Sequence, residues 1–148
     1  MLTKLKYVGV KVDNLLDIYV LFIRSVAEYC SVVFHSTLTG EQSNTIERIQ
    51  RTCLKIILGE MYMDYSSALE MTGLDSLSDR RSKRCLDFSL KVIKNQRNSR
   101  LFPLNPTVGA INSRNCEKYK VNFASTSAYK DSTIPFCQRL LNDHCKTK

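Results

Sequence analysis

The sequence predicts a mainly α-helical fold, in which a small helical bundle is followed by a loop-rich C-terminal extension with a short strand and a final short helix. Through most of the first part of the chain, apolar residues recur every three or four positions, as on one face of a helix. After Leu101, prolines and a glycine interrupt that pattern. We therefore expect a helical domain over residues 1–100 and an extension over residues 101–148.

A first helix is expected from an N-cap at Asp13 to about Val33. Two neighbouring apolar stripes run along it at helical spacing. One stripe is Leu15, Tyr19, Phe22, Val26, Tyr29 and Val33, and the other is Leu16, Val20, Ile23, Ala27 and Cys30. Because a helix that is apolar over most of its circumference must be covered by other elements, we predict that this helix is central and the most buried.

The second helix has signals at both of its ends. Thr39 and Gln42 match the spacing of a capping box, and Gly59 suits the left-handed position that follows a last turn. The predicted core stripe of this helix is Ile46, Ile49, Cys53 and Ile56. The pattern therefore predicts a helix between Thr39 and Gly59.

Two further helices are predicted. Residues 64–72 fit a short helix closed by the following glycine, and Ser76 with Asp79 fits the start of a longer helix that continues to about Asn95. The inward face of the longer helix carries Leu77, Cys85, Phe88 and Val92, widened by Leu86, Leu90 and Ile93. Arg81 shares this apolar face, so we expect it to be partly buried and paired with a carboxylate from another helix.

The C-terminal extension is predicted from local signals alone. Residues 101–115 fit a connecting loop, because helix-breaking residues punctuate them. Lys118–Phe123 alternates polar and apolar residues with a period of two, which is typical of an edge strand. Pro135 fits the first turn of a final short helix whose apolar residues are Phe136, Leu140 and Leu141.

Positive charge is concentrated in one segment of the chain. The sequence holds 22 basic and 14 acidic side chains, and seven of the eight net positive charges fall within residues 80–100. Within that segment, Arg80, Arg84, Lys91 and Lys94 are spaced to line the outer side of the predicted fourth helix. Such a local excess attracts polyanions. Charge alone leaves two interpretations open, a helix that contacts nucleic acid and an ordinary solvated face.

The second helix carries a smaller basic face. Arg48, Arg51 and Lys55 recur at i, i+3 and i+7 and therefore project from one side. Glu47 stands four residues before Arg51, so part of this charge can be paired within the helix. Tyr62 and Tyr65 flank a nearby turn, where packing at the rim of the core is more common than stacking on bases. The candidate nucleic-acid-binding residues are Arg48, Arg51, Lys55, Arg80, Arg84, Lys91 and Lys94.

No catalytic, cofactor or metal site is predicted. The two histidines have no nucleophile or acid arranged as a relay, and no glycine-rich phosphate loop is present. The six cysteines lack zinc-site spacing, and Cys30, Cys53 and Cys85 lie on apolar stripes as small core residues.

The longest apolar run, Ile18–Ile23, is too short to cross a bilayer, so no membrane partner is expected. Met1–Asn14 lacks the apolar core of a signal peptide, which predicts reduced cysteines and an intracellular location, in nucleus or cytoplasm.

Short motifs follow one another in a definite order almost from end to end. They include Leu5-Lys6…Gly9-Val10, Tyr19…Phe22-Ile23-Arg24…Glu28-Tyr29…Phe34-His35-Ser36, Leu38-Thr39…Gln42…Ile46-Glu47-Arg48-Ile49-Gln50-Arg51, Lys55-Ile56-Ile57-Leu58-Gly59, Tyr65…Ala68-Leu69…Gly73-Leu74…Leu77…Arg80-Arg81…Phe88 and Ile134-Pro135-Phe136…Arg139-Leu140-Leu141-Asn142. In this order and spacing the chain resembles the C-terminal part of the reverse transcriptases of LINE-type (non-LTR) retrotransposons, in the Jockey-like group.

The resemblance implies a helical thumb followed by a post-thumb extension, with a template–product duplex as partner. It does not carry polymerase activity to this chain, because the Tyr/Phe-Ala-Asp-Asp box that holds the catalytic metals in the family's palm is absent, as are the fingers. The family often has proline where Ser25 stands, so its kink is not implied here. Two alternatives stay open: a helical protein-interaction module whose apolar surface meets the missing palm or another protein, and a retroelement remnant without a selected role.

Overall fold

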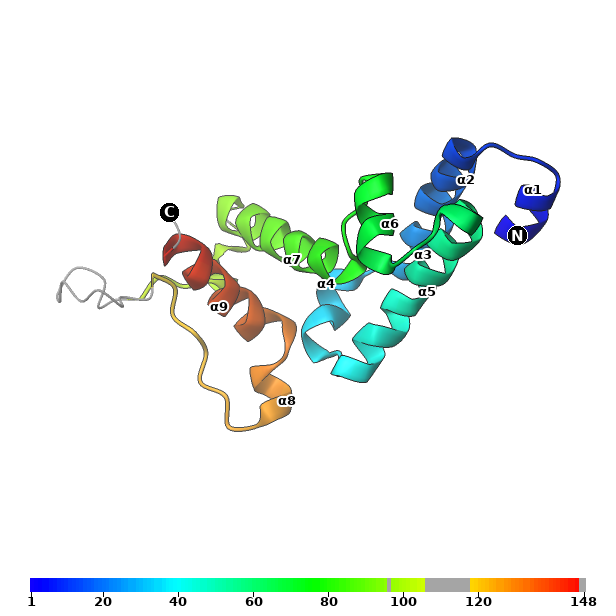
Figure 1. Ribbon diagram of the computed structural model, residues 1–148. Coiled ribbons are helices and arrows are strands. Elements are labelled where there is room, and N and C mark those ends of the chain that lie inside the picture. Colours follow the sequence, from blue (N-terminus) through cyan, green and yellow to red (C-terminus); the bar gives the residue numbers. More distant parts are fainter. Residues whose placement is uncertain (96, 106–117, 147–148) are drawn as a thin grey trace. The chain divides into compact units, whose positions relative to one another are not determined.

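The computed structural model describes residues 1–95, 97–105 and 118–146, and the fold is mainly α-helical, as predicted (Figure 1). The helices are α1 (Leu2–Tyr7), α2 (Val12–Ile18), α3 (Ser25–Ala27), α4 (Ser31–Phe34), α5 (Gly40–Leu58), α6 (Tyr65–Thr72), α7 (Leu77–Lys94), α8 (Ser127–Lys130) and α9 (Thr133–Lys146). A π-helical segment, Tyr19–Arg24, joins α2 to α3, and 3-10 turns lie at His35–Thr37, Gly59–Met61 and Ser99–Leu101.

The chain forms two compact units. Unit 1 comprises Met1–Cys30 and Leu38–Arg81, and unit 2 comprises Ser31–Thr37 and Ser82–Lys148. The division runs through α7, so these units cut across the predicted domains 1–100 and 101–148. Each unit contains a cluster of buried apolar residues of its own, and each is described separately below.

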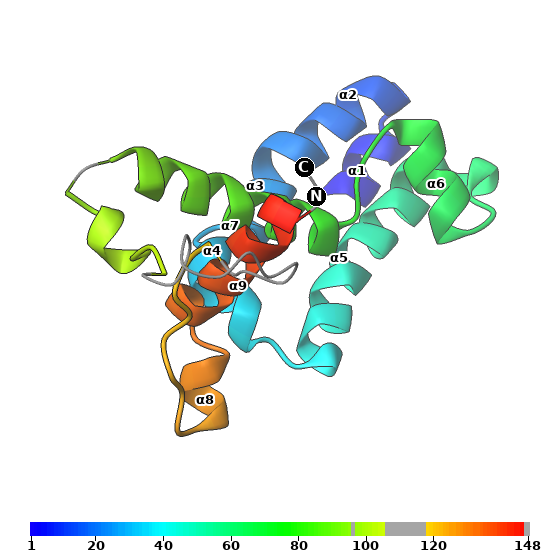
Figure 2. The same cartoon turned by 90° about the vertical axis from the view of Figure 1, so that its left-hand side faces the viewer.

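The core of unit 1 forms where α1, α2 and α5 pack together (Figures 1 and 2). Leu15 and Tyr19 are fully buried on one side of this core, and Ile57 of α5 is fully buried on the other. The amino group of Lys6 on α1 donates hydrogen bonds to the carbonyls of Ile56 and Ile57, at 2.7 and 3.1 Å. Lys6 thereby satisfies carbonyls in the last turn of α5, which would otherwise lack helical partners.

Helix ends in unit 1 follow their predicted signals. Thr39 and Gln42 form the capping box at the start of α5, with bonds of 3.2 and 3.0 Å. Gly59 after α5 has the expected positive φ of 60°, although its ψ of −118° lies outside the left-handed helical region. Gly73 closes α6 in the left-handed conformation as predicted, with φ 64° and ψ 23°, and Asp64 is the N-cap of α6, a role that was not predicted from the sequence. These features depend on neighbouring residues only, which is why the sequence reveals them.

Replacing Gly73 with alanine should lower the free energy of unfolding by about 1 kcal/mol, because a side chain is strained at a φ of +64°. Urea denaturation followed by circular dichroism measures the change. Gly40→Ala is the matched control, since Gly40 is helical, lacks a positive φ and has open space around its Cα. The control should be neutral or stabilising. Equal destabilisation by both substitutions would contradict a specific role for the Gly73 conformation.

The first helix departs from prediction at both ends. Helix α2 begins at Val12, and Asp13 lies in its first turn instead of capping it, so the predicted N-cap is wrong. An acid in the first turn still complements the helix dipole. The helix continues through the π-helical segment to Ala27 and then breaks, because Cys30 adopts a positive φ of 53°. The residues up to Val33 therefore do not form one continuous helix.

The predicted burial of the first helix is also wrong in part. Leu15 and Tyr19 are buried, but Phe22, Val26 and Tyr29 of the same stripe are exposed, as is Val33 in unit 2. The π-helical segment explains the change, because a π turn holds more residues than an α turn and rotates every later side chain relative to a 3.6-residue repeat. The stripe consequently leaves the core after its first two members.

The buried faces of α5 and α7 are shifted from their predicted positions. Ile49 is exposed, whereas the polar Gln50 is fully buried; the buried residues of α5 are Gln50, Cys53, Leu54, Ile57 and Leu58. On α7, Ser89 is fully buried in place of the predicted Phe88, which is exposed. Ser89 tolerates burial because its hydroxyl donates to the carbonyl of Cys85 at 2.7 Å. The pattern of apolar residues alone cannot predict that hydrogen-bonded polar residues such as Gln50 and Ser89 lie in the core.

Unit 2 contains a second core, formed by the later part of α7, by α9 and by the segments on either side of residues 106–117. Its buried apolar residues are Cys85, Val92, Phe102, Tyr119, Cys137 and Leu141. Pro135 lies in the first turn of α9 as predicted, but this helix is 14 residues long and not short. Helix α8, which Thr126 caps, was not predicted. The predicted loop 101–115 is described only as far as Asn105, and the rest lies outside the described residues.

The predicted strand Lys118–Phe123 is absent from the described structure, in which only an isolated antiparallel bridge pairs Leu104 with Tyr119. The side chain of Asn142 takes the place of a neighbouring strand. It accepts the backbone N–H of Tyr119 at 2.8 Å and donates to the carbonyl of Tyr119 at 2.9 Å. One turn earlier on α9, Gln138 accepts the N–H of Asn122 at 2.9 Å. We call this Gln138–Asn142 pair the α9 clamp.

Replacing Asn142 with alanine should lower the free energy of unfolding by about 2 to 4 kcal/mol. The reason is that the N–H and the carbonyl of Tyr119 would both lose a partner in a buried environment. Asn14→Ala is the matched control, because Asn14 is an exposed helical asparagine, and its loss should change stability by less than about 0.5 kcal/mol. Urea denaturation of both variants measures the difference. A cost for Asn142→Ala no larger than that of its control would refute the clamp.

Cysteine burial agrees with prediction at two of three positions. Cys53 and Cys85 are buried, and burial raises the pKa of the Cys53 thiol. Cys30 is exposed, so its predicted place in the core is wrong, because it lies in the break after α3. Cys137, in the core of unit 2, is also buried, and its thiol pKa is likewise raised by burial.

Candidate nucleic-acid interface

The two units carry very different charges. Unit 1 has nine basic and ten acidic side chains, whereas unit 2 has thirteen basic and four acidic ones. Unit 2 therefore holds a net charge of +9, and unit 1, at −1, is close to neutral. A polyanion is attracted to the unit that carries the excess. Most of the positive charge in residues 80–100 thus belongs to unit 2, whereas Arg80 and Arg81 belong to unit 1.

The outer face of α7 gathers basic side chains of unit 2. Arg84, Lys91 and Lys94 are all exposed. With a rotation of about 100° per residue, they lie within an arc of about 80° on the helix. Arg97 and Arg100, which follow α7, are exposed as well. We call Arg84, Lys91 and Lys94 the α7 row; its members share one side of the helix, as the sequence predicts.

One acidic residue interrupts the α7 row. Asp87 is exposed and lies three residues after Arg84 and four before Lys91, so helical geometry places it on the same side. Its carboxylate reduces the local positive potential. The row is therefore cationic on balance without being purely cationic.

Arg80 does not belong to this surface. Its Nε and Nη2 donate to the two carboxylate oxygens of Glu28, at 2.6 and 3.2 Å, and Glu28 is almost completely buried. This forked hydrogen bond to Glu28 raises the pKa of the Arg80 guanidinium. The charge of Arg80 is thus compensated inside unit 1, and the structure gives it a structural role in place of the predicted contact with nucleic acid.

The basic face of α5 lies over two tyrosine rings in unit 1. The guanidinium of Arg51 is 5.0 Å from the centre of the Tyr65 ring, and the amino group of Lys55 is 5.4 Å from that of Tyr62. Such cation–π contacts hold the two cations in place at exposed positions. Each cation also covers one face of its ring, which disfavours stacking of a base there. Arg48 completes this face and is exposed.

Glu47 does not form the ion pair with Arg51 that its spacing allows. Its carboxylate accepts the backbone N–H groups of Leu77 and Ser78, at 3.1 and 3.3 Å, and the hydroxyl of Tyr65. Glu47 thereby satisfies the orphan donors at the start of α7, where a negative charge also complements the helix dipole. The predicted Ser76–Asp79 cap is present at the same end, with bonds of 2.8 and 3.0 Å.

A buried polar network joins the π-helical segment Tyr19–Arg24, α5 and α6 in unit 1. The hydroxyl of Tyr19 donates to Gln50 Oε1 at 2.6 Å, and Gln50 Nε2 donates to the hydroxyl of Tyr65 and the carbonyl of Asp75, at 3.1 and 3.0 Å. Burial raises the pKa of the Tyr19 hydroxyl, which therefore stays protonated and keeps donating. The network fixes the tyrosine that lies beneath Arg51.

Arg81 is more deeply buried than predicted. It is fully buried, and its Nη2 donates to the hydroxyl of Ser43 at 2.9 Å. Its Nε and Nη1 have no hydrogen-bond partner within the described part of the chain, so the predicted carboxylate partner is replaced by a hydroxyl. A buried cation with two unpaired N–H positions is costly, and its burial keeps it away from any exposed phosphate.

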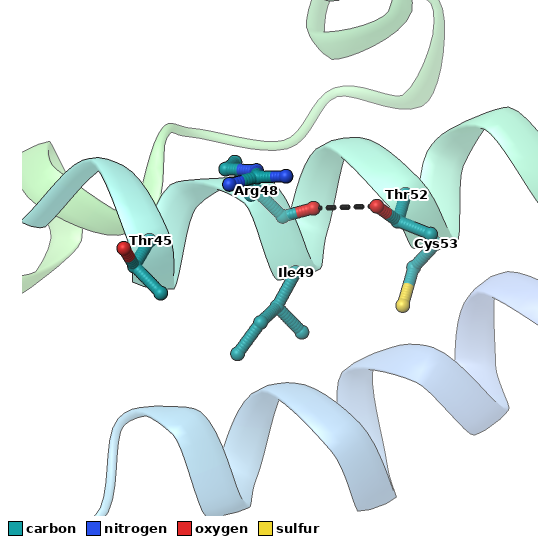
Figure 3. A pocket seen from close by; sticks show the side chains of 5 residues that line it. All are labelled: Thr45, Arg48, Ile49, Thr52 and Cys53. Atoms are coloured by element: carbon teal, nitrogen blue, oxygen red, sulfur yellow. Dashed lines mark hydrogen bonds between the residues drawn. The ribbon is translucent and has the colours of Figure 1, made fainter. Parts of the chain in front are cut away.

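The linings of two cavities among the described residues do not resemble a catalytic site. One of about 340 Å³ lies along α5 and is lined by Thr45, Arg48, Ile49, Thr52 and Cys53 (Figure 3). Figure 3 shows Ile49 pointing toward the helix that faces α5, while the carbonyl of Arg48 accepts the Thr52 hydroxyl at 2.8 Å. A second cavity, of about 500 Å³ in unit 2, is lined by Ile93, Phe102, Pro103, Leu104, Lys118 and Tyr119. Neither lining set pairs an acid with a base or a nucleophile.

Among the described residues, no group of three or more histidine, cysteine, aspartate or glutamate side chains is placed to hold a metal ion. None of the helices seen in residues 1–95, 97–105 and 118–146 has the length and apolar character needed to cross a membrane. No protein-family model, curated protein or solved structure matches the chain.

Proposed function

We propose that this chain is a thumb-like part of a LINE-type retroelement reverse transcriptase, which holds a nucleic-acid duplex without itself catalysing a reaction. The observation that carries the binding proposal is the charge of unit 2, a net +9 beside a nearly neutral unit 1. The α7 row within that unit supplies three exposed cations on one side of a helix. The family assignment rests on the ordered motifs of the sequence.

Binding of this kind is expected to be independent of base sequence. Lysine and arginine side chains on the outside of one helix meet phosphate oxygens, which carry no sequence information. The proposal includes an intracellular location, in nucleus or cytoplasm, where such a duplex would be met. It assigns no cofactor, metal or membrane to the chain.

The salt dependence of binding tests the proposal. If the three residues of the α7 row each neutralise one phosphate, the logarithm of the affinity should fall with the logarithm of the salt concentration at a slope of about −2.7. Arg97 and Arg100 would make the slope steeper. Fluorescence anisotropy with two 20-base-pair duplexes of unrelated sequence should give the same slope and similar affinities. A slope near zero, or a strong preference for one duplex, would remove the proposal's basis.

The rival function, a helical protein-interaction module, is favoured by a different observation in unit 1. Leu21, Phe22, Val26 and Tyr29 are large apolar residues there, and all four are exposed. If the chain were a retroelement remnant without a selected role, we would expect neither salt-dependent duplex binding nor a specific protein contact.

A further inference from the structure

One aromatic ring of unit 2 is almost completely exposed. Phe123 is 90% exposed, although Tyr119, four residues before it, is buried and Val121, two residues before it, is half-buried. Alternate residues of an extended chain point to the same side, so a regular strand would turn Phe123 inward as well. The chain instead presents this ring to solvent. Single exposed apolar residues are ordinary, so the surroundings of the ring must decide what it contacts.

The backbone on both sides of Phe123 is held in place. The N–H of Asn122 donates to Gln138 of the α9 clamp at 2.9 Å, and the Asn122 side chain donates to the hydroxyl of Tyr129 at 3.3 Å. After Phe123, the chain enters α8, which Thr126 caps (Figure 1). An aromatic side chain has few torsions, so a ring on an anchored backbone loses little conformational entropy when another molecule covers it.

The segment that carries the ring is basic. Lys118–Lys130 contains three lysines, all of them exposed, and no acidic residue. The next residue, Asp131, lies 3.8 Å from the guanidinium of Arg139, which balances its charge. The segment also belongs to unit 2, whose net charge is +9. A polyanion is therefore attracted to the surface on which Phe123 is exposed.

The polar residues that follow the ring favour a nucleic-acid base as its partner. Ser125 and Ser127 are exposed, whereas the centre of a protein interface is formed mainly by apolar side chains. Hydroxyl groups of this kind donate to phosphate and sugar oxygens. A base has an aromatic face for Phe123 and lies on a strand of phosphates for the lysines. Within a duplex, neighbouring bases cover each face, so a protruding ring requires an unpaired base.

We propose that Phe123 is a stacking platform for one unpaired base of the nucleic acid that unit 2 holds, while lysines of Lys118–Lys130 contact phosphates of the same strand. This inference rests on the proposed function and adds to it a preference for a duplex that continues into a single strand. The preference is independent of base identity, because every base has an aromatic face.

Three nucleic acids test the proposal with the full chain. All contain the same 20 base pairs: one is blunt, one has a strand extended by five thymidines at each end, and one has the same extensions without bases. The abasic extensions keep the phosphates and remove the faces that stack. Stacking of one base strengthens binding by about fivefold to 150-fold. Fluorescence anisotropy should therefore show at least about fivefold tighter binding of the thymidine extensions than of the abasic ones.

Two matched variants locate the contact. Phe123→Leu keeps an apolar side chain without an aromatic face, so it should abolish the preference for thymidine over abasic extensions and bind the blunt duplex within about twofold of wild type. Tyr7→Leu removes an aromatic ring that is 93% exposed in unit 1, and it should retain the preference. Both variants should keep the wild-type circular dichroism spectrum, because both side chains lie outside the core.

A third variant reports on the stacked ring directly. The chain contains no tryptophan, so Phe123→Trp introduces a single indole. This variant should keep the preference for thymidine extensions, because an indole also offers an aromatic face. Its fluorescence should be quenched by the thymidine extensions and remain unchanged with the abasic ones.

The contrary results separate this inference from the proposed function. Equal binding of thymidine and abasic extensions by the wild type would overturn the stacking proposal and leave duplex binding intact. A preference that survives Phe123→Leu would place the stacked base elsewhere, and an indole that is not quenched would refute contact at this position. No binding of any of the three nucleic acids would overturn the proposed function, and this inference with it.

Discussion

Alanine at Arg84, Lys91 and Lys94 together should weaken duplex binding at least tenfold in 0.05 M salt and make the salt slope shallower by about 2.7. Each of these cations is expected to release about one counterion from the duplex, so their combined loss removes about 2.7 from the slope. Fluorescence anisotropy over a series of salt concentrations measures both quantities. Because the three side chains are exposed, the substitutions should leave the fold intact.

The matched control removes three cations from unit 1. Arg48, Arg51 and Lys55 changed together to alanine lower the net charge by the same amount, yet they should change the slope by less than about one unit, because unit 1 is nearly neutral. Equal losses from both triple variants would mean that total charge, and not the α7 row, governs binding. Wild-type binding by the α7 variant would exclude the row altogether.

A change of the opposite sign is expected at Asp87. Asp87→Asn removes the carboxylate that helical geometry places on the side of the α7 row, so affinity for the duplex should rise severalfold at low salt, and the gain should shrink as salt is added. The same anisotropy assay measures it. An unchanged affinity would argue that the duplex does not approach this side of α7.

Replacing Gln50 with alanine should lower the free energy of unfolding by about 3 to 5 kcal/mol. The substitution opens a cavity at a fully buried position and removes the acceptor of the buried Tyr19 hydroxyl. Urea denaturation, followed by circular dichroism, measures the change. Gln42→Ala on the same helix is the control; it removes one half of an exposed capping box and should cost at most about 1 kcal/mol.

A double-mutant cycle separates the hydrogen bond from the cavity. In a Tyr19→Phe background there is no hydroxyl left to lose its acceptor, so Gln50→Ala should cost about 1 to 2 kcal/mol less than in the wild type. An identical cost in both backgrounds would show that the 2.6 Å contact contributes nothing to stability, which the buried position of both partners argues against.

The features that the sequence predicts correctly are those encoded by near neighbours. The Thr39–Gln42 box and the Ser76–Asp79 cap each join residues three positions apart. Gly73 adopts the left-handed conformation readily because it has no side chain. Helix ends built in this way can be derived from a short window of sequence.

The features that the sequence misses depend on distant partners. Glu47 has the right spacing to pair with Arg51, yet it binds the start of α7, 30 residues away. Gln50 is buried because Tyr19 and Asp75 satisfy its amide, and no apolar pattern marks such a position. The π-helical segment has more residues per turn than an α-helix. An apolar stripe extrapolated at 3.6 residues per turn therefore no longer follows the buried face beyond this segment.

The sequence also predicts the candidate interface only in part. Helical geometry was sufficient to gather Arg84, Lys91 and Lys94 on one side of α7. The compensation of Arg80 by Glu28 was not, because the two residues are 52 positions apart. The division of charge between a neutral and a strongly basic unit also required the structure, since the boundary between the units falls within α7, after Arg81.

The α9 clamp has a consequence for how this region can evolve. Gln138 and Asn142 recognise the main chain at Asn122 and Tyr119, and they make no demand on the side chain of Lys120, which is exposed. Mutations can therefore accumulate at such intervening positions without loosening the attachment. Diverged copies of this sequence should keep the two amides at their four-residue spacing while the segment they hold drifts.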